Sequence, residues 1–280
     1  MQRIVGQNLL DGILNVMNKV IYILLSVAAL TSCANSYNIQ GSSDVSMLDG
    51  RMLYLKVIQD NSLKNVDSCD VVHGQFHFTG SVDSTKVATL FMDDESIIPV
   101  VIEHGDIVVK LDNAQQNVTG TPLNDRLTEF LKEYNKLENQ MAELGRKQSQ
   151  AIMNGEDENV TNEKLALEAQ QIAQDEDKLI TTFITENFDN VLGPWVFFMI
   201  TANYRYPELQ PWIEDIMSKA TDYFKNDSYV KDYYEKAKQN EAIMNGMAEP
   251  QGVPQQPVNT PLPQAPTPNQ MAAPADSVKQ

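Results

Sequence analysis

The sequence predicts an α+β protein in which an antiparallel β-sandwich or partly open barrel is followed by an all-helical domain with a long helical hairpin. From Tyr37 to Leu111, apolar and polar residues alternate with a period of two, as in short antiparallel strands. From Asn124 onward the period is about 3.5 residues, as in helices that share an apolar seam. We therefore expect a β-domain over residues 37–123 and a helical domain over residues 124–246.

The β-domain is expected to contain seven strands. Phe76 and Phe78 alternate with polar residues, which predicts one buried and one solvated face. His73-Gly74 fits a tight hairpin turn, and continued pairing of its two strands would place Cys69 opposite Phe78, facing the core, with His77 facing solvent. The expected strands have the sequences YNIQG, RMLYLKVIQ, KNVDSCDVV, GQFHFTGSV, KVATLFM, IIPVVIE and DIVVKL.

The helical domain begins with two apolar seams. Phe130, Leu137 and Leu144 recur every seven residues, and a second seam ends at Phe183. The polar stretch between the seams is short, which predicts an antiparallel helical hairpin whose second helix is capped by Thr161. Further helical stretches are expected after it, one with Pro194 in its first turn and two over residues 208–221 and 228–245.

A short apolar run over residues 20–30 precedes Cys33. A helix needs about 20 residues to cross a bilayer, so the run is too short to do so, but it has the length of the apolar core of a secretory signal. The sequence LTSC at residues 30–33 resembles the lipobox of bacterial lipoproteins. This resemblance implies a signal peptide over residues 1–32, with Met17 as an alternative start, and lipid attachment at Cys33 in a lipidated N-terminus, residues 33–36. A plain secretory signal with a chance cysteine is the alternative.

The composition limits the classes of function. The net charge is −17, and removal of residues 1–32 leaves 19 basic and 37 acidic residues, a net charge of −18. Such an acidic chain is not expected to bind nucleic acid or to be drawn to anionic lipid, because both need clustered Lys and Arg. Residues 247–280 hold eight of the 13 prolines and are expected to form a disordered Pro/Gln-rich tail.

Four segments, YNIQGSS, DSCDVVHGQFHFTGSV, PVVIEHGDIVVKL and VTGTPLNDRLTEF, resemble the DUF4369 domain of Bacteroidetes lipoproteins. The resemblance extends from Tyr37 to Tyr134. It implies a small β-domain that follows a lipobox and commonly precedes a helical connector and a thioredoxin-like domain of the AhpC/TSA or TlpA type. The stretch FITENFDNVLGPWVFF is similar to that connector, in which an E-N-x-x-N-x-x-G pattern recurs. The W-C-x-x-C motif of the thioredoxin-like domain is missing from this sequence, so the resemblance implies a shared scaffold and location and transfers no catalytic residue.

Several side chains could form a functional site or serve a structural role. Cys69, His73 and His77 are spaced like zinc ligands, but the predicted strand geometry favours a buried, unreactive Cys69; a thiol that forms mixed disulfides with a partner is the remaining alternative. Ser84 and Ser277 lie in sequences that resemble the D-S/T-small sequon of Bacteroidetes O-glycosylation. No hydrolase, metalloprotease or nucleotide-binding motif occurs in the sequence, so we expect no enzymatic activity, no cofactor and no metal site.

We therefore expect a non-enzymatic, lipid-anchored cell-envelope protein that acts as a binding or scaffolding module for an envelope protein partner. The sequence ANSY after the lipobox lacks the acidic pair that resembles a surface-export signal, which favours the outer membrane with the protein facing the periplasm. The alternative is an accessory factor that docks to envelope thiol-disulfide oxidoreductases. Aromatic residues of the helical domain could line a groove for a partner peptide or sugar, although core packing is the commoner role: Trp195, Phe197, Phe198, Tyr204, Tyr206 and Trp212.

Overall fold

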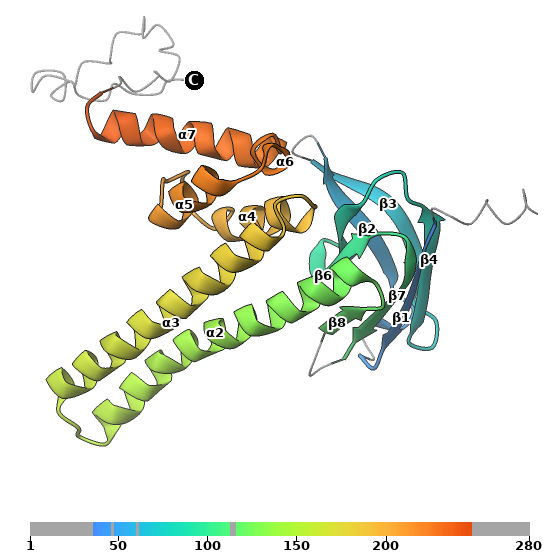
Figure 1. Cartoon of the computed structure of the whole chain (residues 1–280). Helices are drawn as coiled ribbons and strands as arrows, with labels where there is room; N and C mark the ends of the chain where they lie inside the picture. Colours follow the sequence, from blue (N-terminus) through green and yellow to red (C-terminus); the bar gives the residue numbers. More distant parts are fainter. Residues whose placement is uncertain (1–35, 46–47, 60–61, 113–115, 248–280) are drawn as a thin grey trace, which may run out of the picture.

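The computed structural model describes residues 36–45, 48–59, 62–112 and 116–247 (Figure 1). It confirms the expected α+β class, because two four-stranded sheets are followed by a helical region. The predicted signal peptide, Cys33, Ser277 and the tail from residue 248 lie outside the described residues.

The β-domain is a partly open sandwich of two four-stranded sheets. All strand pairs are antiparallel except β1 with β7, which is parallel. The seven expected strands are present, and β8 is an eighth that the alternation did not predict. In order across the sheets, sheet A is β4 (Gln75–Ser81), β1 (Ser36–Ser43), β7 (Gly105–Leu111) and β8 (Gln116–Thr119), and sheet B is β3 (Ser62–Asp70), β2 (Met52–Gln59), β5 (Lys86–Met92) and β6 (Glu95–Ile102).

The core of the sandwich consists of side chains that alternate along the strands. On β7, for example, Ile107, Val109 and Leu111 are buried while the residues between them are exposed. The edge strand β3 differs, because most of its residues are exposed. The largest fully buried side chains between the sheets are Ile39, Leu53, Leu55, Phe78, Leu90 and Ile107.

The turn at His73-Gly74 was predicted correctly, but the strand pairing beyond it was wrong. Both residues have positive φ, 51° and 70°, and Val72 and Gln75 form a bridge across the turn. The two strands then separate into different sheets, so Cys69 pairs with Leu53 on β2 and not with Phe78. Cys69 is consequently only half-buried instead of facing the middle of the core.

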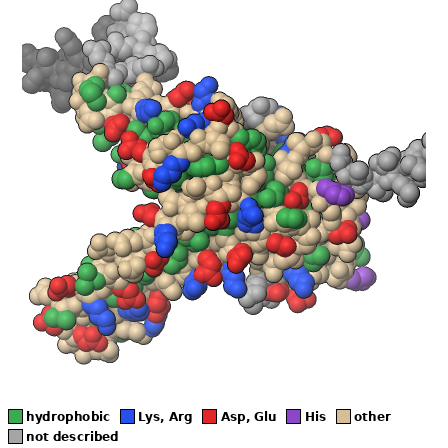
Figure 2. Space-filling view, viewed as in Figure 1, with side chains coloured by type: hydrophobic (Ala, Val, Ile, Leu, Met, Phe, Trp, Pro, Cys, Tyr) green, Lys and Arg blue, Asp and Glu red, His purple; other side chains and the backbone are tan. Residues whose placement is uncertain are grey.

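The two long helices α2 (Pro122–Met153) and α3 (Glu158–Glu186) form the predicted antiparallel hairpin, here called the arm. Figure 1 shows the arm projecting away from the rest of the molecule. Asp157, not Thr161, caps α3, because its carboxylate accepts hydrogen bonds from the first-turn N–H groups. Figure 2 shows acidic and basic side chains interspersed along the arm.

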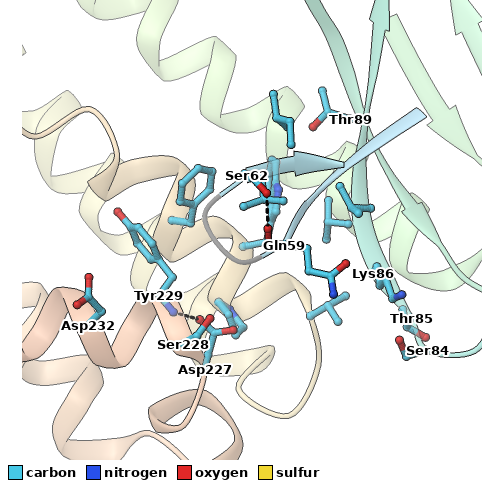
Figure 3. A pocket seen from close by; sticks show the side chains of 18 of the residues that line it. Gln59, Ser62, Ser84, Thr85, Lys86, Thr89, Asp227, Ser228, Tyr229 and Asp232 are labelled. Carbon is cyan, nitrogen blue, oxygen red and sulfur yellow. Dashed lines mark hydrogen bonds between the residues drawn. The ribbon is translucent and has the colours of Figure 1, made fainter. Parts of the chain in front are cut away.

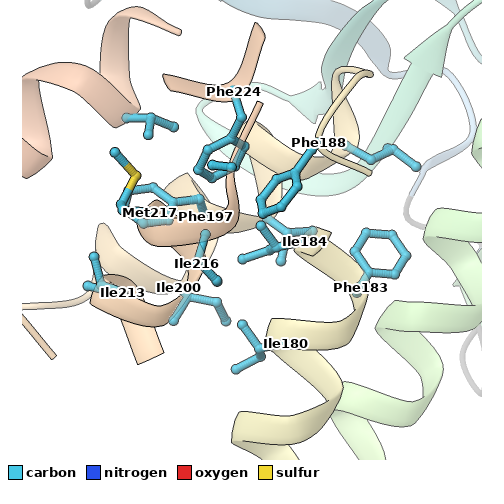
Figure 4. Close-up of a cluster of buried hydrophobic side chains, with 14 of the residues drawn as sticks. Ile180, Phe183, Ile184, Phe188, Phe197, Ile200, Ile213, Ile216, Met217 and Phe224 are labelled. Atoms are coloured by element: carbon cyan, nitrogen blue, oxygen red, sulfur yellow. The ribbon is translucent and has the colours of Figure 1, made fainter. Parts of the chain in front are cut away.

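The remaining helices pack against the base of the arm around a second hydrophobic core (Figure 4). Phe197 is fully buried there, with its ring edge-on to those of Phe224 and Tyr233. These helices are α4 (Leu192–Thr201), α5 (Pro211–Lys219), α6 (Asp222–Lys225) and α7 (Ser228–Met244). Pro194 lies in the first turn of its helix, as predicted. The stretch expected over 208–221 contains one helix, α5, and the short α6 that follows it was not predicted.

The start of α2 fastens the helices to the edge of sheet B. The buried Asn124 side chain accepts a hydrogen bond from the Val101 N–H and donates one to the Val101 carbonyl, both at 2.8 Å. The carboxylate of Glu103 accepts hydrogen bonds from the N–H groups of Leu123 and Asn124 and so caps α2. Across the described ranges, no helix has the length and apolar character needed to span a membrane.

Candidate functional site: a cleft between the two domains

A cleft of about 1250 Å³ lies between the β-domain and the helices (Figure 3). One wall is formed by the adjoining ends of β2 and β3 and by the start of β5. The other is formed by α4, α6 and the first turns of α7. Figure 3 shows Lys86 and Thr85 on the strand side, and Tyr229 and Asp232 on the helical side.

The strand wall exposes aliphatic side chains. Ile58 on β2 is paired with Leu63 on β3, and both are 54% exposed. Val57 and Val87 continue this surface toward the interior, where they are more buried. Removing apolar area from water contributes about 25 cal/mol per Å². A ligand that covers this exposed pair would therefore gain binding free energy in proportion to the area it buries.

The helical wall is aromatic and held in place by ring packing. The rings of Phe198 and Tyr229 meet edge to face, with centroids 4.9 Å apart. The Tyr229 hydroxyl lies 3.1 Å from the hydroxyl of Thr201, which is buried. Trp195 and Tyr223 complete this surface, and Tyr223 is 50% exposed. Aromatic faces of this kind suit prolines, aliphatic side chains and sugar rings.

The two carboxylates on the helical wall already have partners. Asp227 caps α7 by accepting hydrogen bonds from the N–H groups of Tyr229 and Val230, at 3.0 and 3.1 Å. Asp232 pairs with Lys236 at 2.8 Å. On the opposite wall, Lys86 is the one basic side chain among the described lining residues. The cleft therefore combines polar and apolar surface in similar measure, and its acidic side chains are engaged within the protein.

The stretch E-N-x-x-N-x-x-G, residues 186–193, builds the turn that orients the helical wall. Asn187 is fully buried; its side-chain oxygen accepts hydrogen bonds from Arg126 and Asn190, each at 2.9 Å. Asn190 in turn accepts a bond from the Leu192 N–H at the start of α4. Gly193 packs so closely that a Cβ atom there would lie 2.4 Å from the Asn187 carbonyl oxygen. This pattern therefore serves a structural purpose in this chain.

The aromatic residues singled out from the sequence divide between the two roles. Trp195 and Phe198 line the cleft, and Trp195 also packs against the helical core, to which Phe197 belongs and against which Tyr204 and Trp212 pack. Sequence reasoning missed Ile58, Leu63, Tyr223 and Tyr229. Periodicity does not reveal that the strand ends lie opposite α4 and α7, because that contact depends on how the two domains dock.

The zinc-like constellation is not assembled. His77 contacts Asn38, with Nε2 2.5 Å from the amide oxygen, and Cys69 lies on a strand of the other sheet. Burial raises the pKa of the Cys69 thiol, a hydrogen bond with the main chain of His77 lowers it, and the nearby Asp67 and Asp70 raise it further. Within the described ranges, no group of three or more His, Cys, Asp or Glu side chains is arranged to hold a metal ion.

Ser84, a candidate glycosylation site, is exposed in the connection between β4 and β5, and it lies at the margin of the cleft. The side chain is accessible to a modifying enzyme in this position. The other predicted modification sites, Cys33 and Ser277, are outside the described residues.

Comparison with known proteins identifies the β-domain. Residues 37–127 match the family model DUF4369, described as a domain of unknown function. No curated protein and no solved structure matches the chain. The match covers β1 to β8 and continues into α2 as far as Leu127, so it includes Asn124 and Arg126. The resemblance predicted from the sequence is thus confirmed: residues 37–127 form a DUF4369 domain.

Proposed function

We propose that this protein is a non-enzymatic binding or scaffolding module of the cell envelope, and that the interdomain cleft is its binding site. The observation that carries the proposal is the apolar surface on both walls, formed by the exposed Ile58 and Leu63 on one side and by the exposed Tyr223 and the half-buried Trp195 on the other. Exposed apolar side chains beside polar groups in a concave site are characteristic of ligand and partner sites.

An extended segment of an envelope protein is the proposed ligand. The cleft is open to solvent between its two walls, and its carboxylates already bind the N–H groups of Tyr229 and Val230 and the ammonium of Lys236. Apolar and proline side chains of the ligand would therefore pack on the aromatic wall. Lys86, Gln59 and the hydroxyl residues of the cleft would form hydrogen bonds with the main chain of the ligand.

The proposed location is the inner face of the outer membrane, through a lipid on Cys33. Each buried methylene of an acyl chain contributes about 0.8 kcal/mol, so several chains on one residue would hold the protein firmly. Intact mass of the protein from membrane fractions tests this. A mass for residues 33–280 plus acyl chains is expected, and an unmodified Cys33 would contradict the anchor.

The binding proposal is tested with variants of the exposed cleft residues. Ile58→Ser and Tyr223→Ser remove apolar surface from opposite walls, and Val72→Ser is the matched control, because Val72 is 58% exposed on the β-domain and does not line the cleft. Envelope partners captured by the chain from residue 34 to 280 should be lost with both cleft variants and retained with Val72→Ser. Equal capture by all three variants would show that the cleft is not the binding site.

A second candidate, docking to envelope thiol-disulfide oxidoreductases, draws on the half-buried position of Cys69 at an exposed edge strand. The raised pKa of this thiol opposes direct thiol exchange, because the thiolate is the attacking species. Docking without covalent exchange is the form of this proposal that agrees with the site. Capture of a thioredoxin-like protein by a Cys69→Ser variant would support it, and loss of that capture would instead indicate direct thiol exchange.

A further inference from the structure

The cleft has a candidate occupant within the same chain. We infer that the C-terminal segment Pro261–Pro268, with sequence PLPQAPTP, docks against the aromatic wall of the cleft. This inference rests on the proposal that the cleft binds an extended peptide, and it names the peptide. The shape of the proline-rich segment, its charge and its reach all fit the cleft.

The shape of the segment suits the wall. Proline-rich chains favour the polyproline II helix, which has three residues per turn, so prolines three apart share one face. Pro263 and Pro266 have this spacing. Such segments dock in grooves lined by aromatic rings, where each ring packs against a proline face. Trp195, Phe198 and Tyr223 provide rings of this kind along one wall.

The charge of the segment is also compatible with the cleft. Residues 250–275 contain no Asp, Glu, Lys or Arg, in a chain with a net charge of −17. The carboxylates of Asp227 and Asp232 are engaged within α7, so an uncharged ligand leaves no buried charge without a partner. An acidic segment, by contrast, would lie beside both carboxylates.

The tail is long enough to return to the cleft. The first turns of α7 line the cleft, and Figure 1 shows this end of α7 beside α6 and the β-domain. The 17 residues of α7 span about 25 Å, at about 1.5 Å per residue. Pro254 is seven residues beyond Met247 and reaches at most about 23 Å, whereas Pro261 reaches about 45 Å, at about 3.3 Å per extended residue. The later prolines therefore reach the cleft without full extension.

Tethering lowers the affinity that docking requires. A flexible linker gives an intramolecular ligand an effective concentration in the millimolar range. A segment that binds with a Kd of about 1 mM would therefore occupy the cleft for about half of the time. Partners of higher affinity would displace it, so the tail would act as a weak competitor of the proposed ligand.

Quenching of Trp195 fluorescence by acrylamide tests the inference. The chain has two tryptophans, so subtracting the signal of a Trp195→Phe variant isolates Trp195. Three forms of residues 34–280 are compared: the native sequence, a variant with Pro261, Pro263, Pro266 and Pro268 replaced by Ala, and a control with Pro250, Pro254, Pro257 and Pro274 replaced by Ala. All three retain every described residue, and circular dichroism checks that their folds agree.

The first variant should show a roughly twofold larger quenching constant for Trp195, because the ring loses the proline face that covers it, and the control should match the native chain. Equal constants in all three forms would overturn the inference, and so would equal increases in both variants. Protection that disappears on dilution would assign the segment to a second copy and overturn docking within one chain. Ile58→Ser and Tyr223→Ser could abolish partner capture while the quenching constant of Trp195 is equal in all three forms. That result would show that the tail does not occupy the cleft, and the proposed function would still stand.

Discussion

Two glycines in helices are expected to respond to alanine with opposite signs. Gly193 is buried near the start of α4, and a Cβ atom there would lie 2.4 Å from the carbonyl oxygen of Asn187 and 3.0 Å from its carbon. Ordinary carbon–oxygen contacts are about 1 Å longer, and the Asn187 main chain is held by the hydrogen bonds of its own side chain. Overpacking of this kind costs about 1–3 kcal/mol.

Gly145 provides the matched control. It is exposed in the middle of α2, and a Cβ atom there would have no neighbour within 4 Å. Gly145→Ala should stabilise the protein by about 0.5–1 kcal/mol, because glycine loses more backbone entropy in a helix than alanine does. The two variants are thus expected to differ by about 1.5–4 kcal/mol in the free energy of unfolding.

Urea unfolding of residues 34–280, followed by circular dichroism, measures both variants. Gly193→Ala should lower the midpoint and Gly145→Ala should raise it. In a domain of this size, 1 kcal/mol corresponds to about 2–4 °C in Tm, so a thermal scan gives a second estimate. If Gly193→Ala were as stable as the native chain, the close approach of α4 to Asn187 would be wrong, and with it the proposed orientation of the helical wall.

Three further outcomes are expected. Asn124→Ala should destabilise the protein by about 2–4 kcal/mol in urea unfolding, because it leaves two buried main-chain groups of Val101 without their partner; a cost near zero would contradict this pairing. Cys69 should react with a maleimide at pH 8 far more slowly in the folded protein than after denaturation, because burial raises its pKa and lowers the thiolate fraction; equal rates would refute the half-buried thiol. Burial and the charge of Glu138 raise the pKa of Glu176 from 4.5. The folded state therefore binds this proton more tightly than the unfolded state does, and the stability that the proton contributes is lost as the pH rises through the raised pKa. Glu176→Gln should therefore stabilise the protein at pH 7, by less than about 1 kcal/mol because solvent screens this partly exposed charge, and leave stability below pH 4 nearly unchanged; an unchanged pH profile would contradict the shift.

The local periodicity of the sequence predicts which segments are strands and helices, but not all of their partners. His73-Gly74 was predicted as a tight turn, and both residues adopt the positive φ that a type I′ turn needs. The assignment of β3 and β4 to different sheets, and the parallel pairing of β1 with β7, depend on long-range packing that no local pattern encodes. The strand β8 was missed because it has only four residues, and only Val118 among them is apolar.

The candidate site was less predictable than the fold. Trp195 and Phe198 are three residues apart, so they share a helix face whether that face meets a core or a cleft. Ile58 and Leu63 looked like ordinary strand residues, and their exposure follows from their place at the end of an edge strand pair. The helical period therefore indicated an apolar face, but not whether that face packs against a core or lines a cleft.

Contacts between the domains explain why the DUF4369 match extends past the last strand. Val101 lies on β6, the edge of sheet B, and the Asn124 side chain gives its main-chain groups the hydrogen bonds that a neighbouring strand would otherwise supply. Two residues later, Arg126 binds Asn187 in the turn before α4. Through these two residues, one helical turn connects the strand wall of the cleft to its aromatic wall. A β-domain cut off before α2 would lose the cover of its sheet edge, so the helices complete the domain as well as the cleft.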